Sequence, residues 1–215
     1  MLSSDDRAQR VFDDVLQGLK NCVNLRRCAW TRDGSLTSEI LQALLCAGAN
    51  VEADSEVKDI PLEYFHKEEL TMRLENCGLR ELEINGHDGS YNRVLLLGFV
   101  GLERISLIMP SAAVVALLPT WTSLNHKTLR RLTLICKVCP VARIPILYLL
   151  AEQSSSVVTD EILTTLAPIL DRLEELHLTG CPKITHNGVL AILATNTRGI
   201  LGLGLEGISS LFVRE

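Results

Sequence analysis

Aromatic residues and long apolar runs are scarce in this sequence. Aromatic side chains make up only 4% of the 215 residues, so the core is built mainly from the abundant leucines. A leucine-built core with few aromatics is typical of a repeat architecture. No apolar run reaches the roughly 18 residues that a membrane helix needs. We therefore expect no membrane segment, and we assign the short apolar runs 94–102 and 144–151 to the core.

Positive charge and targeting signals are also lacking. The net charge of −5 leaves no basic surface of the kind that binds nucleic acid or an anionic membrane. The first residues, MLSSDDRAQRVFDD, are acidic and lack the positive-then-apolar order of a signal peptide. The seven cysteines, an odd number without a disulfide framework, then indicate reduced thiols. These features predict a cytoplasmic or nuclear protein that binds no nucleic acid.

Catalytic and cofactor motifs are absent as well. The sequence has no Walker A motif, no G-x-S-x-G, no H-E-x-x-H and no paired-carboxylate motif. Cys136 and Cys139 have C-x-x-C spacing but lack the second close pair that a structural zinc site needs, so we expect buried thiols. Gly202, Gly204 and Gly207 spell G-x-G-x-x-G inside an expected strand, where a nucleotide-binding turn does not fit. We expect no enzyme activity and no cofactor.

One pattern does recur: six copies of L-x-x-L-x-L, with occasional apolar or cysteine substitutes. The copies are Leu25, Cys28 and Trp30; Leu79, Leu82 and Ile84; Leu102, Ile105 and Leu107; Leu129, Leu132 and Leu134; Leu173, Leu176 and Leu178; and Ile200, Leu203 and Leu205. Three of the five intervals between copies, of 23, 27 and 27 residues, fall within the leucine-rich-repeat range of about 20–29. Apolar residues at motif positions 4 and 6 alternate with polar ones, which predicts a short half-buried strand.

Helical periodicity lies between the expected strands. The helical segments are 11–22, 36–45, 157–170 and 184–195. Thr37 and Thr159 stand at N-cap positions, and Asp160 and Glu161 follow where the helix dipole favours acids. Since a single strand–turn–helix unit cannot bury its apolar faces, the units have to stack. We predict an α/β solenoid, a leucine-rich-repeat arc with a parallel concave sheet and convex helices, as one domain over 1–215.

The two long intervals predict irregular inserts. Residues 46–78 begin as an acidic loop and continue as a helix with Pro61 at its first position. Residues 138–153 carry two prolines and much apolar bulk, which suit neither a strand nor a solvated loop. An alternative for either segment is a gene-model error, such as translation of an unspliced intron across 138–153.

The best-preserved unit shows a family resemblance. The segment LEELHLTGCPKITHNGVLAIL resembles the cysteine-containing leucine-rich repeat, with Leu173, Leu176, Leu178, Cys181, Ile184 and Thr185 on its pattern. The whole chain is similar to the repeat portion of fungal F-box/leucine-rich-repeat-like proteins. That resemblance implies repeats that hold a substrate, and an F-box that docks on the adaptor of a cullin–RING ubiquitin ligase.

Both ends of the chain depart from that family. Only residues 1–24 precede the first expected strand, which is too few for an F-box, and neither end shows a polar cap. We therefore expect a repeat domain that lacks the F-box and is incomplete at both ends. Cullin–RING components are expected partners only if an F-box lies upstream. The alternative is a truncated or degenerate paralogue with no binding function of its own.

The unit 173–188 also contains potential metal ligands. On a repeat, His177 points outward from the strand, Cys181 turns inward beneath the turn, and His186 stands at the helix start. Because these side chains face different directions, we expect no metal site.

The expected functional feature is instead the concave sheet face, where motif positions 3, 5 and 7 point outward. The candidate residues for binding a protein partner are Arg27, Glu81, Glu83, Asn85, Arg104, Ile108, Arg131, Ile135, Glu175, His177 and Thr179. Glu81 and Arg104 are expected to form a cross-strand ion pair, and Ile108 and Ile135 an apolar spot. Such a mixed surface suits protein recognition.

Overall fold

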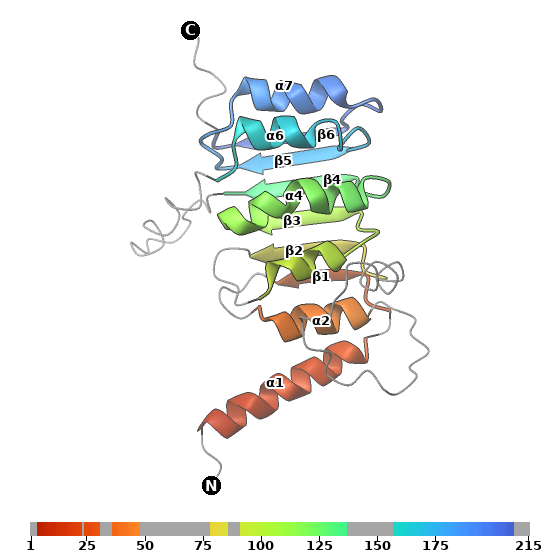
Figure 1. Cartoon of the computed structure of the whole chain (residues 1–215), viewed down its shortest axis with the longest axis vertical. Coiled ribbons are helices and arrows are strands. Elements are labelled where there is room, and N and C mark those ends of the chain that lie inside the picture. Colours follow the sequence, from red (N-terminus) through yellow and green to blue (C-terminus); the bar gives the residue numbers. More distant parts are fainter. Residues whose placement is uncertain are drawn as a thin grey trace.

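A computed structural model describes residues 4–22, 24–30, 36–47, 78–85, 91–136 and 157–208. Its centre is a parallel sheet whose six strands follow one another in chain order (Figure 1). The strands are β1 (Arg27–Trp30), β2 (Glu81–Asn85), β3 (Arg104–Ile108), β4 (Arg131–Ile135), β5 (Glu175–Thr179) and β6 (Gly202–Glu206). Each strand falls on one copy of the L-x-x-L-x-L pattern, so the six strand predictions are confirmed.

The strands pair with equivalent motif positions side by side. In the β3–β4 pair, for example, Ile105 lies opposite Leu132 and Leu107 opposite Leu134. From β2 to β5 every position 4 and position 6 side chain is at most 2% exposed. Burying a leucine or isoleucine side chain contributes about 1.5–3 kcal/mol to the free energy of folding. The stacked apolar side chains therefore fix which face of each strand turns inward.

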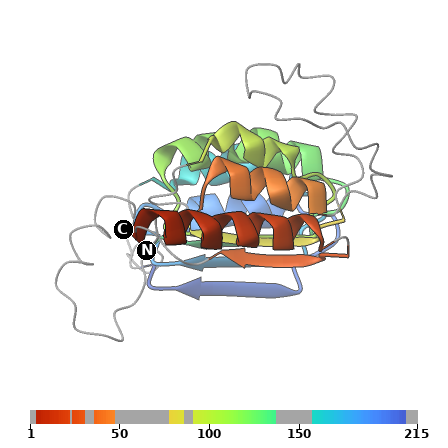
Figure 2. The ribbon, with the colours of Figure 1, turned by 90° about the horizontal axis from the view of Figure 1, so that it is seen from below.

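All helices of the described residues lie on one face of the sheet (Figure 2). They are α1 (Ser4–Lys20), α2 (Ser38–Ala47), the 3₁₀ helix η2 (Arg93–Gly98), α4 (Ala112–Asn125), α6 (Asp160–Leu166) and α7 (His186–Thr195). Among the described residues no helix covers the opposite face, which we name the open face. The architecture is therefore an α/β fold with one helical layer, and the core lies between that layer and the sheet.

Two of the helix N-termini are capped by threonine side chains. Thr37 Oγ1 accepts a hydrogen bond from the backbone N–H of Ile40 at 3.4 Å, as predicted. Thr185 Oγ1 accepts one from Asn187 N at 3.1 Å. Thr159 stands at the N-cap of α6, but its side chain makes no capping bond, so that part of the prediction was wrong.

Some element boundaries differ from the predicted ones. Helix α1 begins at Ser4, well before the periodic segment 11–22, and α2 continues to Ala47, past the predicted start of the first insert. Apart from residues 46, 47 and 78, that insert lies outside the described residues, as does the whole of the second insert, 138–153.

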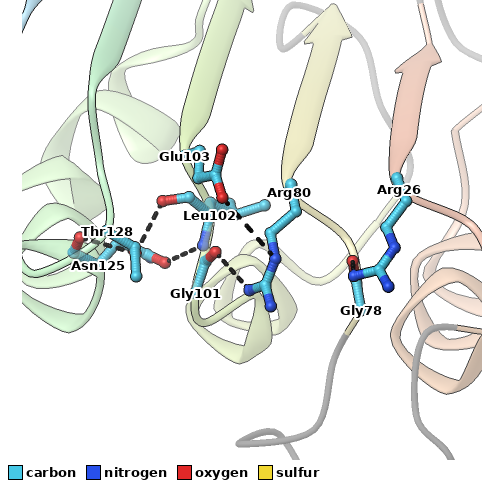
Figure 3. A network of polar contacts seen from close by, with 8 residues as sticks. All are labelled: Arg26, Gly78, Arg80, Gly101, Leu102, Glu103, Asn125 and Thr128. Atoms are coloured by element: carbon cyan, nitrogen blue, oxygen red, sulfur yellow. Dashed lines mark hydrogen bonds and ion pairs between the residues drawn. The ribbon is translucent and has the colours of Figure 1, made fainter.

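Two asparagines at equivalent positions tie neighbouring units together. Asn125 and Asn196 each stand four residues before the first position of a strand motif. Asn125 Oδ1 accepts a hydrogen bond from Leu102 N at 2.8 Å, and Asn196 Nδ2 donates to Leu173 O at 2.7 Å. Leu102 and Leu173 are the first positions of the preceding motifs. Figure 3 shows the Asn125 bond, beside which Thr128 Oγ1 donates to Leu102 O at 2.9 Å.

The open sheet face as candidate functional site

The polar candidates at motif position 3 line up across the sheet. The residues of this charged row are Arg27, Glu81, Arg104, Arg131 and Glu175, and each is the Cα partner of the next. Parallel pairing in register brings them together, because neighbouring strands lie only about 4.8 Å apart. The candidates at positions 5 and 7 form further rows towards the C-terminal ends of the strands.

Ion pairs divide the charged row into two groups. In the first, Glu81 Oε2 accepts from Arg27 Nε at 2.5 Å, and Glu81 Oε1 lies 3.1 Å from Arg104 Nη1. The second of these contacts confirms the predicted Glu81–Arg104 pair. In the other group, Glu175 Oε2 pairs with Arg131 Nη2 and lies 3.3 Å from His177 Nε2. No ion pair of the described residues joins Arg104 to the Arg131 group.

The arginines lower the pKa of both glutamates in the row. For Glu81 the largest cause is the hydrogen bond from Arg27, and the charges of Arg104 and Arg131 act in the same direction. For Glu175 the largest cause is the hydrogen bond from Arg131, followed by the one with His177. Both carboxylates therefore stay ionised, and the row keeps its charge pattern at neutral pH.

Acid is expected to remove the contribution of this row to stability. Since the folded-state pKa of each glutamate lies below its unfolded value, the stabilisation is complete above about pH 4.3 and is lost as the pH falls through the folded pKa. Thermal melting should show the Glu81→Gln/Glu175→Gln variant to be about 2–4 °C less stable than the wild type at neutral pH. That gap should narrow towards about pH 3, as the pH falls towards the lowered folded-state pKa values and the wild-type carboxylates begin to be protonated too. A gap of equal size at both pH values would contradict the prediction.

A second set of charges lies at the N-terminal edge of the sheet, at motif position 2. This edge row consists of Arg26, Arg80, Glu103, Arg130 and Glu174. Its side chains mainly hold the turns: Arg80 Nη1 donates to Gly101 O at 2.9 Å, and Arg26 Nη1 to Gly78 O at 3.4 Å (Figure 3). Arg80 Nε lies 4.0 Å from Glu103, and Arg130 Nε lies 3.3 Å from Glu174. This row was not predicted from the sequence, although position 2 is charged in five of the six copies of the motif.

The middle of the open face is less charged. Ser106 and Thr133 are register partners, and so are Ile108 and Ile135 two residues further along β3 and β4. All four side chains are half-buried. The two isoleucines thus lie side by side as predicted.

The remaining candidates differ in how much of them is accessible. Glu83, His177 and Thr179 are half-buried on the open face. Asn85 is only 7% exposed, so its prediction as an accessible contact residue was wrong. It is still the register partner of Ile108, so its burial, and not a change in the alternation, removes it from the accessible face.

Two glycines of β6 leave space for the side chains of β5. A Cβ atom at Gly204 would lie 2.4 Å from His177 Nδ1, and one at Gly202 would lie 3.1 Å from Glu175 Cγ. The G-x-G-x-x-G match therefore belongs to a strand, as predicted, and its first two glycines accommodate His177 and Glu175.

The cysteines and histidines of the candidate metal set point in different directions. His177 lies half-exposed on the open face, Cys181 is fully buried, and His186 is exposed at the start of α7. Cys181 instead meets Cys136, also fully buried, with 2.8 Å between the sulfur atoms. Cys139 lies outside the described residues. In the described part of the chain no group of three or more His, Cys, Asp or Glu side chains is arranged to hold a metal ion.

Thiol labelling should distinguish these cysteines. The hydrogen bond with Cys181, and then burial, raise the pKa of Cys136, and burial raises the pKa of Cys28 to about 11. The thiolate is the reactive form, but Cys181, whose pKa the hydrogen bond with Cys136 lowers, is fully buried and out of reach of the reagent. Iodoacetamide at neutral pH should therefore modify exposed Cys22 at least about tenfold faster than Cys28, Cys136 or Cys181. Peptide mass spectrometry after timed labelling would measure this, with the unfolded chain as the control in which all seven react. Equal rates in the folded protein would contradict the prediction.

Comparisons with known proteins give no match to any family model, curated protein or solved structure. No helix of the described residues is both long enough and apolar enough to cross a membrane.

Proposed function

We propose that the chain is a non-catalytic protein-interaction scaffold, a leucine-rich-repeat solenoid whose open face holds a protein partner. The observation that carries the proposal is the single sheet of six parallel strands in chain order, with one face free of helices in the described residues. Equivalent motif positions lie in register from β1 to β6, as stacking of equivalent units requires.

The chemistry of the open face supports binding of a protein. It combines five paired charges, a polar centre and two adjacent isoleucines, so no single charge sign or apolar character dominates it. Mixed surfaces of this kind are typical of protein-recognition sites. Extended sheet faces built by repetition provide such surfaces over several units.

A steric block in the centre of the open face tests the proposal. Thr133→Arg places a long charged side chain on β4, whereas Thr164→Arg places the same side chain on the exposed surface of α6 as a matched control. Affinity purification with quantitative mass spectrometry should recover partners with the wild type and with Thr164→Arg, and lose them at least about tenfold with Thr133→Arg. If the same proteins are recovered with both variants, the open face is not the binding surface.

We further propose that this scaffold is the substrate-recognition part of a cullin–RING ubiquitin ligase subunit. The support is the resemblance of residues 173–193 to the cysteine-containing repeat, with Cys181 buried beneath its turn in the structure. The same purification tests this link, using both this chain and a version extended upstream. If cullin–RING components are enriched by neither, the ligase assignment is wrong.

The alternative proposal is a truncated or degenerate paralogue without a binding function. Apolar side chains at the β6 end of the sheet favour it, since Leu201 is 82% exposed and Leu203 43%. A thermal melt followed by circular dichroism separates the two proposals: a broad, non-cooperative loss of structure supports the degenerate product, and a sharp transition contradicts it.

A further inference from the structure

Two like charges face each other at the centre of the open face. Arg104 and Arg131 are Cα partners on the middle strands β3 and β4, and both side chains are partly exposed. Each is held by a glutamate on its outer side, Glu81 for Arg104 and Glu175 for Arg131, and the row has no acid between them. Like charges directly opposite each other in a sheet are destabilising, so an anion between the two guanidinium groups would be favourable.

Hydrogen-bond donors exceed acceptors at this end of the sheet. The charged row and the edge row together contain six arginines and four glutamates, a net charge of +2 in a chain whose total is −5. Two arginine nitrogens, Arg131 Nε and Arg130 Nη1, are buried without a hydrogen-bond partner among the described residues. Unsatisfied donors of this kind carry a cost. Because these two atoms are closed to solvent, a carboxylate would approach the exposed parts of the same side chains, which are 31% exposed for Arg130 and 34% for Arg131.

The same two strands carry an apolar pair further along. Ile108 and Ile135 stand four residues after Arg104 and Arg131, a distance of about 13 Å along an extended chain. Only the small side chains of Ser106 and Thr133 lie between the two pairs. We name these six residues of β3 and β4 the central strip.

We propose that the central strip binds an extended segment of a partner protein through two anchors. An aspartate or glutamate of the segment lies between Arg104 and Arg131, and an aliphatic or aromatic side chain four residues away packs on Ile108 and Ile135. This inference rests on the proposed use of the open face and adds the chemistry of the partner. Side chains of an extended segment four residues apart point to the same side, so one segment reaches both anchors.

Selection from a displayed library of random twelve-residue peptides on the whole chain tests the inference. The expected result is enrichment of an acidic residue and an apolar residue four positions apart. Synthetic copies of the enriched peptides should bind Arg104→Gln/Arg131→Gln at least about tenfold more weakly by fluorescence anisotropy, since each charge-assisted hydrogen bond contributes substantially. The matched control is Arg7→Gln/Arg10→Gln, which removes two exposed arginines from α1 and should leave the affinity within about twofold.

The remaining outcomes separate this inference from the proposed function. Two outcomes overturn the two-anchor inference and keep the open face as the binding surface. In one, the enriched peptides lose affinity for Thr133→Arg but not for Arg104→Gln/Arg131→Gln. In the other, the enriched peptides lack the acidic residue. Peptides that bind Thr133→Arg as well as the wild type bind elsewhere on the chain and overturn the inference, whereas partner recovery in the purification experiment decides the proposed function. If no peptide is enriched, the two-anchor inference is overturned. The proposed function is not, because partner recovery in the purification experiment tests the open face separately. Melting curves of each variant establish that a lost affinity is not a loss of folding.

Discussion

Replacing Asn125 with alanine is expected to lower the free energy of unfolding by about 2–4 kcal/mol. Asn125 is 1% exposed and its side chain serves three backbone groups. Its Oδ1 accepts from Leu102 N at 2.8 Å, and its Nδ2 donates to Phe99 O and Trp121 O, both at 2.9 Å. Phe99 O keeps a second donor in Trp121 Nε1 at 3.2 Å, but Leu102 N–H loses the side chain that satisfies it. A buried donor without a partner costs about 1–3 kcal/mol, more than the roughly 1 kcal/mol that an average hydrogen bond contributes.

Asn196→Ala is the matched control for Asn125→Ala. Asn196 occupies the equivalent position before the last motif but is only half-buried, so water can replace part of what its side chain supplies. Its loss is expected to cost about 1 kcal/mol. Urea unfolding of both variants and of the wild type measures the difference. If Asn125→Ala costs no more than Asn196→Ala, the buried bond to Leu102 does not hold the two units together.

The strands could be predicted from the sequence because their signal is local and repeated. Alternation at motif positions 4 and 6 marks each strand, and every copy was found on its strand. Helices α2, α6 and α7 could be located from their apolar spacing. Helix α4 was not found for two physical reasons. Its sequence is apolar nearly all round, which removes the one-sided periodicity, and Pro119 in its interior suggests an end rather than a continuation.

The candidate site was predictable in outline but not in its pairing. The period of two places position 3 outward in every copy, and this placed Glu81 and Arg104 correctly. The pairing register of neighbouring strands decides which charges meet. The inserts hide that register in the sequence, because they make the spacing between copies of the motif unequal. The Arg131–Glu175–His177 group therefore emerges only once β4 and β5 are paired across 44 residues. The meeting of Cys136 with Cys181 depends on the same pairing.

The second large effect is expected at motif position 4, where two equivalent leucines differ in burial. Leu176 of β5 is fully buried, and Leu203, its register partner on β6, is 43% exposed. Leu176→Ala removes apolar surface and leaves a cavity, which typically costs about 2–5 kcal/mol. Leu203→Ala removes side-chain atoms that are partly in water already, so it should cost about 1 kcal/mol or less.

Urea unfolding of Leu176→Ala and Leu203→Ala measures whether the β6 end of the sheet is uncovered in solution. A large difference between the two is expected, because the side chains are chemically the same and differ only in what packs over them. Equal costs would mean that another surface buries Leu203 in solution. Repeating both measurements over a range of protein concentrations would then identify the source of that cover, since burial against a second copy strengthens with concentration and burial within the chain does not.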